Sequence, residues 1–176
     1  MQQNREVGWE GFFNARDLGG LPTLDGEVTR FGAFLRSADL RFVTPAGWRE
    51  AHAAGVRTIA DLRNDDEVLP ADRTDASEVS AEIERVRIPL DDSADTEFWA
   101  HVHREHLDGN PLYYRPFLDR KGTRCAAAIT AFAAAGPGGI LFHCGVGRDR
   151  TGLVALLLLS LARVDPEVTR SHCARL

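Results

Sequence analysis

The feature that most constrains this chain is one continuous stretch, residues 139–163, which reads GGILFHC, GVGRD, RTG and then an apolar run. Gly139 to Phe142 is a short apolar segment bounded by glycine, which is typical of a buried strand. Gly145 and Gly147 allow the backbone to turn sharply and to bring its N–H groups close to a ligand. From Thr151 the sequence is apolar enough for a helix buried on nearly all sides. The stretch therefore predicts a strand, a tight loop and a helix whose N-terminus favours an anion.

Cys144 and Arg150 both lie in this loop. A cysteine surrounded by N–H donors and a guanidinium ionises readily to the nucleophilic thiolate. Arg150 can hold two phosphate oxygens in a bidentate fork while Cys144 attacks the phosphorus. The pair alone is weak evidence in an arginine-rich chain, but the surrounding strand, glycines and helix make the pattern specific. It predicts phosphoryl transfer to sulfur followed by hydrolysis. The alternative is a buried structural cysteine in a strand–helix turn.

The loop sequence HCGVGRDRTG resembles the signature loop of the cysteine-based protein tyrosine phosphatases. Three upstream stretches narrow the resemblance to bacterial tyrosine and lipid phosphatases: NARDLGG at Asn14–Gly20, FLRSADL at Phe34–Leu40 and IADLR at Ile59–Arg63. The likeness covers most of the chain. It implies an α/β fold of the protein tyrosine phosphatase type, similar to dual-specificity phosphatases, with a mostly parallel central sheet flanked by helices. It implies neither a metal nor a cofactor.

Roles for the loop residues follow from this chemistry and from the resemblance. Cys144 is the expected nucleophile, and Arg150 is the expected clamp on the phosphate and the transition state. By resemblance, Thr151 donates to the thiolate and eases its departure. His143 is expected to fix the geometry of the loop. The backbone N–H groups expected to bind the phosphate belong to the loop residues Gly145, Val146, Gly147 and Arg148.

A general acid is also required, because the leaving oxygen needs a proton. In the bacterial relatives the aspartate inside the signature loop is the candidate, and it corresponds to Asp149. Asp91 and Asp92 are the alternatives, because they follow a predicted strand over 85–90. If that strand is parallel to its neighbours, it ends at the same edge as Cys144. The plainer interpretations are a solvated loop carboxylate at 149 and a helix N-cap at Asp92 or Ser93.

Arg63, Arg16 and Asp17 are expected to support the site. Arg63 follows a predicted strand over 56–62, at the edge where open parallel sheets bind ligands. Arg16 and Asp17 belong to NARDLGG, which by resemblance packs beside the phosphate site. The alternatives are structural: a local ion pair between Arg16 and Asp17, and a salt bridge from Arg63 to an acidic neighbour at Asp65, Asp66 or Glu67.

The other predicted elements alternate between strands and helices, as in an α/β domain. A hairpin turn at 24–27 and a strand over 28–37 precede a helix from Thr44 and Pro45 to 54. Further helices are expected over 76–84, 94–107 and 123–135 and from Asp165 onward, with a short helical or irregular piece at 111–118. The histidines at 101, 103 and 106 are expected to be surface residues, because the first lies off the helix face that the others share.

Length and charge exclude several other classes of protein. A single domain is expected for 176 residues, with 1–11 loosely held, and a net charge of −5 gives no case for nucleic acid. Three cysteines show no disulfide pattern, and the N-terminus shows no secretory signal. The apolar run 152–162 is too short to cross a membrane. A cytoplasmic protein is therefore expected, with non-classical export left open.

The substrate and the partners are less constrained. Phosphotyrosine in a protein or peptide is one expectation. Phosphoserine or phosphothreonine is another, and so is a phosphoinositide, because relatives with a lysine in place of Arg148 often accept phosphoinositides. Relatives usually continue for several helices beyond about residue 170. We therefore expect either a partner chain, as in a homo-oligomer, or exposed apolar surface over the helix after Thr151. The rival functions are a phosphate- or phosphoinositide-binding pseudo-phosphatase and a rhodanese-like sulfurtransferase.

Overall fold

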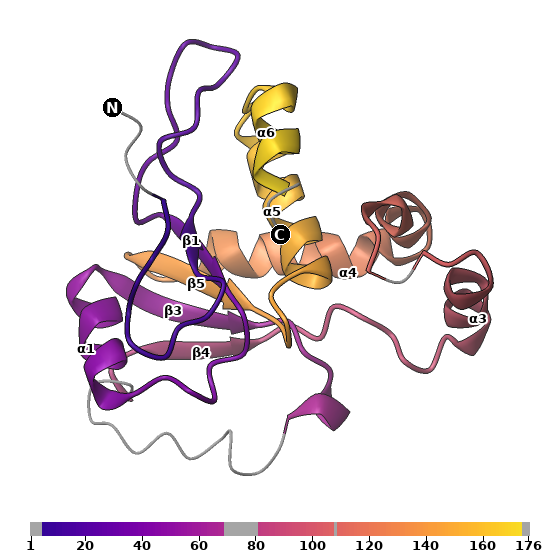
Figure 1. Ribbon diagram of the computed structural model, residues 1–176, viewed down its shortest axis with the longest axis horizontal. Helices are drawn as coiled ribbons and strands as arrows, with labels where there is room; N and C mark the ends of the chain where they lie inside the picture. Colours follow the sequence, from indigo (N-terminus) through magenta and orange to yellow (C-terminus); the bar gives the residue numbers. More distant parts are fainter. Residues whose placement is uncertain (1–4, 69–80, 108, 174–176) are drawn as a thin grey trace.

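The computed structural model of the chain describes residues 5–68, 81–107 and 109–173. At its centre is a five-stranded sheet in the order β1-β2-β5-β3-β4 (Figure 1). The strands are β1 (Arg16–Asp17), β2 (Phe34–Ser37), β3 (Val56–Asp61), β4 (Glu84–Arg87) and β5 (Gly139–His143). The pairs β2–β5, β5–β3 and β3–β4 are parallel, and β1 runs antiparallel to β2. The expected mostly parallel α/β sheet is confirmed.

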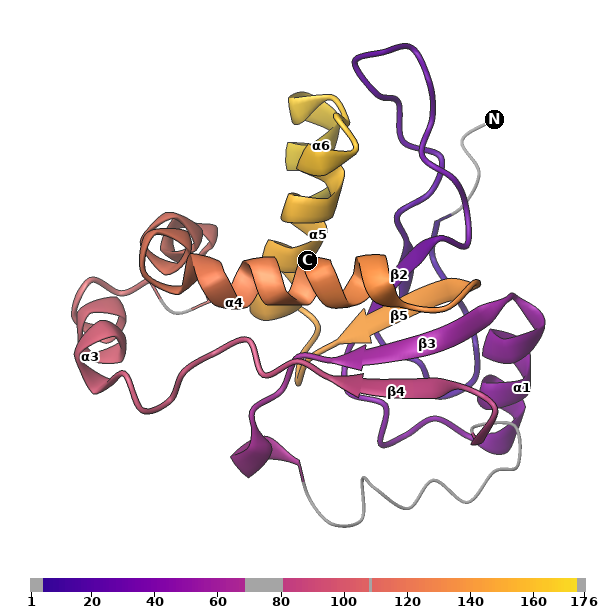
Figure 2. The same cartoon turned by 180° about the vertical axis from the view of Figure 1, so that it is seen from behind.

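Helices cover both faces of this sheet (Figures 1 and 2). The helix α1 (Pro45–Ala53) lies on one face, and α4 (Tyr114–Ala134) and α5 (Asp149–Leu161) lie on the other. Because successive side chains of a strand point to opposite faces, β5 contributes to two cores. Leu141 packs in the cluster that contains α1, whereas Ile140 and Phe142 pack in the cluster that contains α4 and α5. The central strand is therefore buried along its whole length.

The helix α1 begins and ends where the sequence predicts. The hydroxyl of Thr44 accepts a hydrogen bond from the backbone N–H of Gly47 at 3.2 Å, and Pro45 occupies the first helical position. At the other end Gly55 has a φ of 93°, a left-handed conformation that glycine adopts without strain. The strand β3 then starts at Val56.

The segment after β4 differs in detail from the expectation. The helix α3 (Thr96–Arg104) is shorter than the predicted helix over 94–107. Its N-cap is Asp95, whose carboxylate accepts from the N–H of Phe98 at 3.2 Å, so the predicted cap at Asp92 or Ser93 is wrong. The cap falls on Asp95 because the chain adopts helical angles only from Thr96.

The two predicted pieces at 111–118 and 123–135 are largely one helix. A 3-10 turn, η3 (Pro111–Tyr113), leads directly into α4. Inside α4 the backbone is non-helical at Lys121, with a φ of −117°, just before Gly122. The kink lies in the gap between the two predicted segments, so the sequence located the irregularity but not the continuity of the helix.

Two further expectations need correction, and a third falls mostly outside the described residues. Of the predicted strand over 28–37, only β2 pairs within the sheet, while Val28 makes an isolated bridge with Pro22 across the hairpin. Most of the predicted helix over 76–84 lies outside the described residues, and Glu84 already begins β4. Residues 5–11, expected to be loosely held, include Val7, whose N–H donates to the carbonyl of Ala15 at 3.0 Å.

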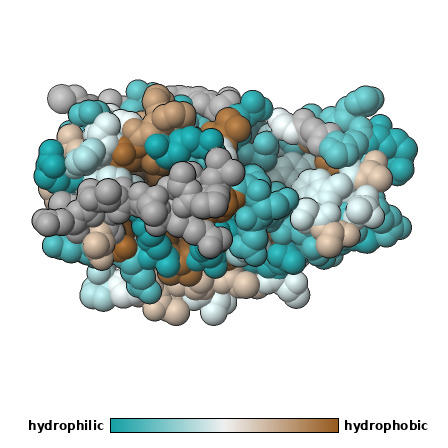
Figure 3. Space-filling view, turned by 90° about the horizontal axis from the view of Figure 1, so that it is seen from below, coloured by the Kyte–Doolittle hydropathy of each residue, from teal (hydrophilic) through white to brown (hydrophobic). Residues whose placement is uncertain are grey.

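The C-terminal part consists of α5 and the short helix α6 (Pro166–Cys173). Most of the apolar side chains of α5 are buried, but Leu161 at its end is 66% exposed. Among the described residues no helix combines the length and the apolar character needed to span a membrane. The face seen in Figure 3 carries small hydrophobic patches among hydrophilic residues.

Candidate active site

The predicted loop lies at the carboxyl edge of the parallel strands. β5 ends at His143, between β2 and β3, and α5 begins at Asp149. Gly147 has a φ of 73°, and a Cβ added there would lie 2.7 Å from the carbonyl oxygen of Ser37. Only glycine fits this position, because the conformation is left-handed and the neighbouring backbone leaves no room. The loop is therefore held tightly between β5, β2 and the first turn of α5.

Cys144 lies at the start of this loop and is almost fully buried, with 3% of its surface exposed. The hydroxyl of Thr151, in the first turns of α5, donates to its Sγ at 3.0 Å. Thr151 is itself fully buried, so this hydroxyl is held in place by its surroundings. The structure thus brings together a sulfur and a hydroxyl donor that the sequence separates by one loop.

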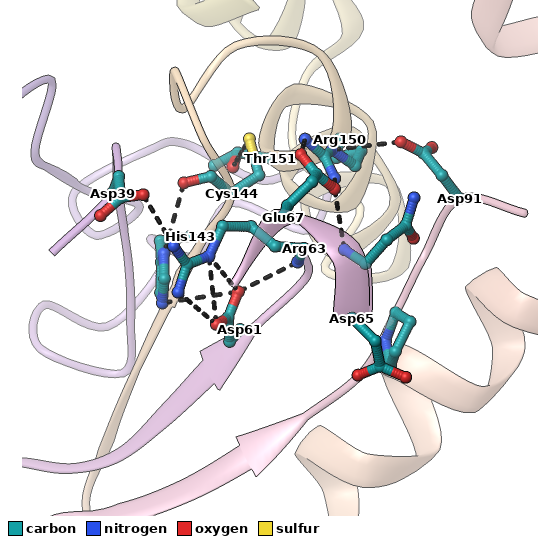
Figure 4. Close-up of polar contacts among 12 residues, drawn as sticks. Asp39, Asp61, Arg63, Asp65, Glu67, Asp91, His143, Cys144, Arg150 and Thr151 are labelled. Atoms are coloured by element: carbon teal, nitrogen blue, oxygen red, sulfur yellow. Dashed lines mark hydrogen bonds and ion pairs between the residues drawn. The ribbon is translucent and has the colours of Figure 1, made fainter. Parts of the chain in front are cut away.

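Arg150 also lies in the first turn of α5, and two carboxylates hold it (Figure 4). Its Nη1 and Nη2 donate to the two oxygens of Glu67 over 2.5 and 2.7 Å, and its Nε lies 3.3 Å from Oδ2 of Asp91. Glu67 belongs to the 3-10 turn η1 (Asp65–Glu67) after β3. Burial disfavours the charged form of Arg150, but the bonds to Glu67 and the charge of Asp91 outweigh it and keep its pKa above the ordinary value. The guanidinium is therefore charged and fixed in orientation.

Asp91 has the most perturbed carboxyl group of this region. Burial raises its pKa to about 6, and the nearby charges of Glu67 and Asp149 add to the rise while Arg150 opposes it. Its Oδ1 is buried without a hydrogen-bond partner among the described residues. A carboxyl group with this pKa keeps its proton to a higher pH than an ordinary aspartate and can donate it, which is the property a general acid needs.

The other two candidate acids lie in different surroundings. Asp149 is the first residue of α5 and is half-buried, close enough to Asp91 to influence its pKa. Asp92 points to α4 instead, where its Oδ2 lies 3.4 Å from Nζ of Lys121 and 3.6 Å from Nη2 of Arg124. The structure thus brings Asp91 to Arg150 and turns Asp92 away from it.

Arg63 is buried behind the site, with 5% of its surface exposed (Figure 4). Its guanidinium donates to Asp39 and to Asp61, each over 2.7 Å. Where the alternative interpretation expects a salt bridge to an acidic residue at 65–67, the structure gives Arg63 ion pairs with Asp39 and Asp61, and its charge also helps to lower the pKa of Glu67. Burial opposes ionisation of Asp61, but the hydrogen bond from Arg63 outweighs it and holds the pKa of Asp61 below its usual value.

His143 connects this ion-pair cluster to the loop. Its Nε2 lies 3.8 Å from Oδ1 of Asp61, and its Nδ1 lies 3.3 Å from the carbonyl oxygen of Cys144. Burial is the main cause that lowers the pKa of His143, so the ring is neutral at physiological pH. His143 therefore contacts the backbone at the start of the loop, and its role in fixing the loop geometry stays a prediction.

The NARDLGG motif contacts the loop through a different residue from those expected. The carboxylate of Asp17 accepts from the N–H groups of Gly19 and Gly32, each at 2.8 Å, and so fixes the turns beside β1. In the part of the chain that the structure describes, neither Asp17 nor Arg16 makes a hydrogen bond or ion pair to the loop. Asn14 does: its Nδ2 lies 3.1 Å from the carbonyl oxygen of Gly147.

Two more residues that sequence reasoning missed contact the site. Arg36, fully buried on β2, donates from Nη2 to the carbonyl oxygen of Gly147 over 2.5 Å. Glu67, considered earlier only as a partner for Arg63, binds Arg150. Asn14 and Arg36 lie within two of the three upstream motifs, so these motifs indicated the right segments but not which side chains reach the loop.

Arg148, at the outer part of the loop, is exposed. Its Nη2 donates to the carbonyl oxygen of Gly109 over 3.2 Å, in the segment after α3. The side chain of Val146, two residues earlier in the loop, is also exposed, with 69% of its surface accessible. These two side chains form part of the outer surface of the loop.

The site thus combines a buried sulfur, a fixed arginine, a loop at a helix N-terminus and a buried carboxyl group whose pKa is raised. Within the described ranges, no group of three or more His, Cys, Asp or Glu side chains is arranged to hold a metal ion. A phosphate group in the loop would lie near the sulfur of Cys144 and near the guanidinium of Arg150, which Glu67 and Asp91 hold.

Comparison with known proteins agrees with this chemistry. The model of the tyrosine phosphatase family matches residues 7–171, which is nearly the whole chain. The chain therefore belongs to the tyrosine phosphatase family.

The sequence identity to individual relatives is low. The chain is 31% identical over 132 residues to a tyrosine-protein phosphatase of Nostoc commune, covering 75% of this chain and 44% of that protein. It is 28% identical over 186 residues to the triple specificity protein phosphatase PtpB of Mycobacterium tuberculosis, covering 90% and 64%. A crystal structure of a candidate phosphatase from Shewanella putrefaciens aligns with a TM-score of 0.42 at 16% identity, over 73% of this chain and 64% of that one. The chain spans less than two thirds of the length of both curated relatives.

Proposed function

We propose that the chain is a protein-tyrosine phosphatase that hydrolyses phosphate monoesters through a cysteinyl-phosphate intermediate. The observation that carries the proposal is the hydrogen bond from Thr151 to the sulfur of Cys144, at 3.0 Å, in a loop that leads to Arg150. A structural cysteine needs no hydroxyl donor on its sulfur. A thiolate that must attack and later leave is stabilised by one.

In the first half of the reaction the thiolate of Cys144 attacks phosphorus. The S–P bond forms, and the P–O bond to the leaving oxygen breaks. Arg150 and the N–H groups of the loop balance the negative charge on the three remaining oxygens. These groups supply the positive field, so the proposal requires no metal ion. A carboxylic acid gives its proton to the leaving oxygen.

In the second half a water molecule attacks phosphorus and the S–P bond breaks. The carboxylate that lost its proton accepts one from this water, and inorganic phosphate leaves. Thr151 donates to the departing sulfur and stabilises the regenerated thiolate. The cycle then returns Cys144 and the acid to their starting states.

Two carboxyl groups can serve as the acid in this scheme. Asp149 is the candidate that the resemblance implies, and the contact of Asp91 with Arg150 at 3.3 Å favours Asp91 as the second. An acid with a pKa of about 6, as at Asp91, must be protonated to act, so kcat/KM falls as the pH rises through this value.

The comparison of three asparagine variants decides between them. If Asp91 is the acid, Asp91→Asn abolishes the fall of kcat/KM above pH 6 and lowers kcat, whereas Asp149→Asn keeps that fall. If Asp149 is the acid, Asp149→Asn is the variant that lowers kcat, and Asp91→Asn keeps the rate of the unmodified protein. Asp92→Asn is the matched control, because its carboxylate faces α4, and it should keep the profile of the unmodified protein. Unchanged rates in both Asp91→Asn and Asp149→Asn would contradict the proposed acid step.

Phosphotyrosine is the substrate class that we propose first, in accordance with the family. The name of the Mycobacterium tuberculosis relative describes it as a triple specificity phosphatase, which keeps phosphoserine, phosphothreonine and other monoesters under consideration. The exposed guanidinium of Arg148 at the outer side of the loop offers a second cation for a phosphoinositide headgroup. We further propose that the protein acts in the cytoplasm.

Phosphate release measures the substrate preference directly. The chain would be incubated with a phosphotyrosine peptide, the matching phosphoserine peptide and vesicles containing a phosphoinositide, each with chelator present. We expect release from the phosphotyrosine peptide to be the fastest. Binding of these ligands without any release would contradict the enzymatic proposal and favour a phosphate-binding protein.

A further inference from the structure

The carbonyl groups of the signature loop are held from behind by residues far away in the sequence. The backbone N–H of Asp39 donates to the carbonyl oxygen of Gly145 at 2.9 Å. The side-chain Nδ2 of Asn14 lies 3.4 Å from the carbonyl oxygen of Val146 and 3.1 Å from that of Gly147. One nitrogen therefore reaches two successive carbonyl groups, which must lie on the same side of the loop.

Arg36 makes the closest of these contacts. Its Nη2 donates to the carbonyl oxygen of Gly147 over 2.5 Å, so Asn14 and Arg36 share one acceptor. Arg36 is fully buried on β2, one residue before the end of the strand that neighbours β5. A buried arginine is costly unless its surroundings use the charge, and a positive charge behind an anion-binding loop adds to the field that attracts the anion.

The orientation of these carbonyl groups determines where the neighbouring N–H groups point. In a planar trans peptide the C=O of one residue and the N–H of the next point in opposite directions. Holding the carbonyl groups of Val146 and Gly147 behind the loop therefore directs the N–H groups of Gly147 and Arg148 to its opposite side. That is the side on which a phosphate must sit to meet backbone donors.

We propose that Asn14 and Arg36 are positioning residues, which clamp the Gly147 carbonyl and thereby preorganise the backbone donors that bind the substrate phosphate. The inference rests on the proposed function in one respect, namely that the ligand of the loop is a phosphate group. Gly147 itself contributes to this arrangement, because its left-handed φ of 73° brings its carbonyl group to the two donors.

The decisive variant is Asn14→Asp. Asn14 itself has a positive φ of 50°, and aspartate is one of the few residues that tolerate this conformation as asparagine does. The substitution therefore keeps the size and the backbone but replaces the donor by a carboxylate that faces two carbonyl oxygens. The matched control is Asn110→Asp, where the side-chain oxygen accepts from the N–H of Leu112 and a carboxylate can do the same.

The measurement is protection of Cys144 against iodoacetate by inorganic phosphate, with the melting temperature recorded for each variant. Protection reports binding of the anion and needs no turnover. We expect Asn14→Asp to raise the phosphate concentration for half protection by about tenfold or more, as loss of supporting partners does in other sites. The melting temperature should fall by only a few degrees or less, and Asn110→Asp should match the unmodified protein.

A second variant tests the same proposal if Asn14→Asp folds poorly. Arg36→Lys retains the charge but not the reach of the guanidinium, and it should weaken protection by phosphate in the same direction. In the double variant the two losses should be less than additive, because both donors act on one carbonyl group. Unchanged protection in either folded single variant, or an equal loss in Asn110→Asp, would overturn the inference. Protection without hydrolysis in the unmodified protein would instead contradict the proposed function and leave the clamp in place.

Discussion

At the scale of single residues, two buried cysteines show how the surroundings of a thiol determine its chemistry. Cys125 lies in α4 within the core, where burial raises the pKa of its thiol to about 11 and the charge of Asp91 adds to the rise. Cys144 is as buried but receives a hydrogen bond on sulfur from Thr151. The first environment keeps a thiol protonated, whereas the second places a hydroxyl donor on the sulfur, which the proposed mechanism requires.

The hydroxyl of Thr151 can be tested by an isosteric change. Thr151→Val keeps the shape of a fully buried side chain but removes the donor to Cys144. A hydrogen bond to a charged group contributes about 1.5–3 kcal/mol, so we expect kcat to fall by about tenfold to hundredfold. Thr151→Ser retains the hydroxyl and should stay close to the unmodified rate. Equal rates in the valine and serine variants would show that the contact has no part in turnover.

At the scale of elements, the loop depends on the close approach of its backbone to β2. Gly147→Ala adds a Cβ that would lie 2.7 Å from the carbonyl oxygen of Ser37, at a position that also has a positive φ. We expect it to lower the free energy of unfolding by more than about 2 kcal/mol and to abolish phosphate binding.

The matched control for this change is Gly26→Ala in the exposed hairpin. Gly26 has a similar φ of 82°, but nothing lies within 4 Å of the added Cβ. Its cost should be the backbone strain alone, about 1 kcal/mol, with phosphate binding intact. Chemical denaturation of both variants gives the comparison. A cost at 147 no greater than at 26 would mean that the loop is not packed as described.

Features set by local sequence were predictable, and contacts between distant segments were not. The cap at Thr44, the stop at Gly55 and the strand, loop and helix around Cys144 follow from neighbouring residues and were confirmed. By contrast, Arg36 and Gly147 are separated by 111 positions, and Arg150 and Glu67 by 83. Periodicity and turn signals carry no information about such pairs, because they depend on the order of strands in the sheet.

The ion-pair partners of Arg63 were likewise not predictable from neighbouring residues. Acidic residues at 65–67 are its neighbours along the chain, yet the guanidinium turns to Asp39 and Asp61. Asp39 follows β2, and β2 and β3 flank β5 in the sheet. These charges come together only because of the order of the strands in the sheet. That order cannot be predicted from the sequence of this chain alone.

At the scale of the whole molecule, the family match extends over residues 7–171, while the relatives are longer than the aligned part. The expectation of self-association through α5 stays a prediction. Leu161 is 66% exposed at the end of this helix, and Leu156 and Leu157 are only partly buried. These side chains are the part of α5 that a second copy could cover.

Sedimentation over a range of protein concentrations tests this prediction. We expect a larger species whose share grows with concentration, and we expect Leu161→Glu to shift the protein to the monomer by placing a charge in the contact. A monomer at all concentrations that binds no dye specific for apolar surface would contradict the expectation.

The central claim is that Cys144 is the nucleophile of a phosphatase that needs no metal. The most direct test is hydrolysis of p-nitrophenyl phosphate in the presence of chelator by the unmodified chain, by Cys144→Ser and by Cys125→Ser. The account predicts turnover in the unmodified chain and in Cys125→Ser, and a loss of at least about a thousandfold in Cys144→Ser. Turnover that survives in Cys144→Ser, or that requires an added metal ion, would contradict it.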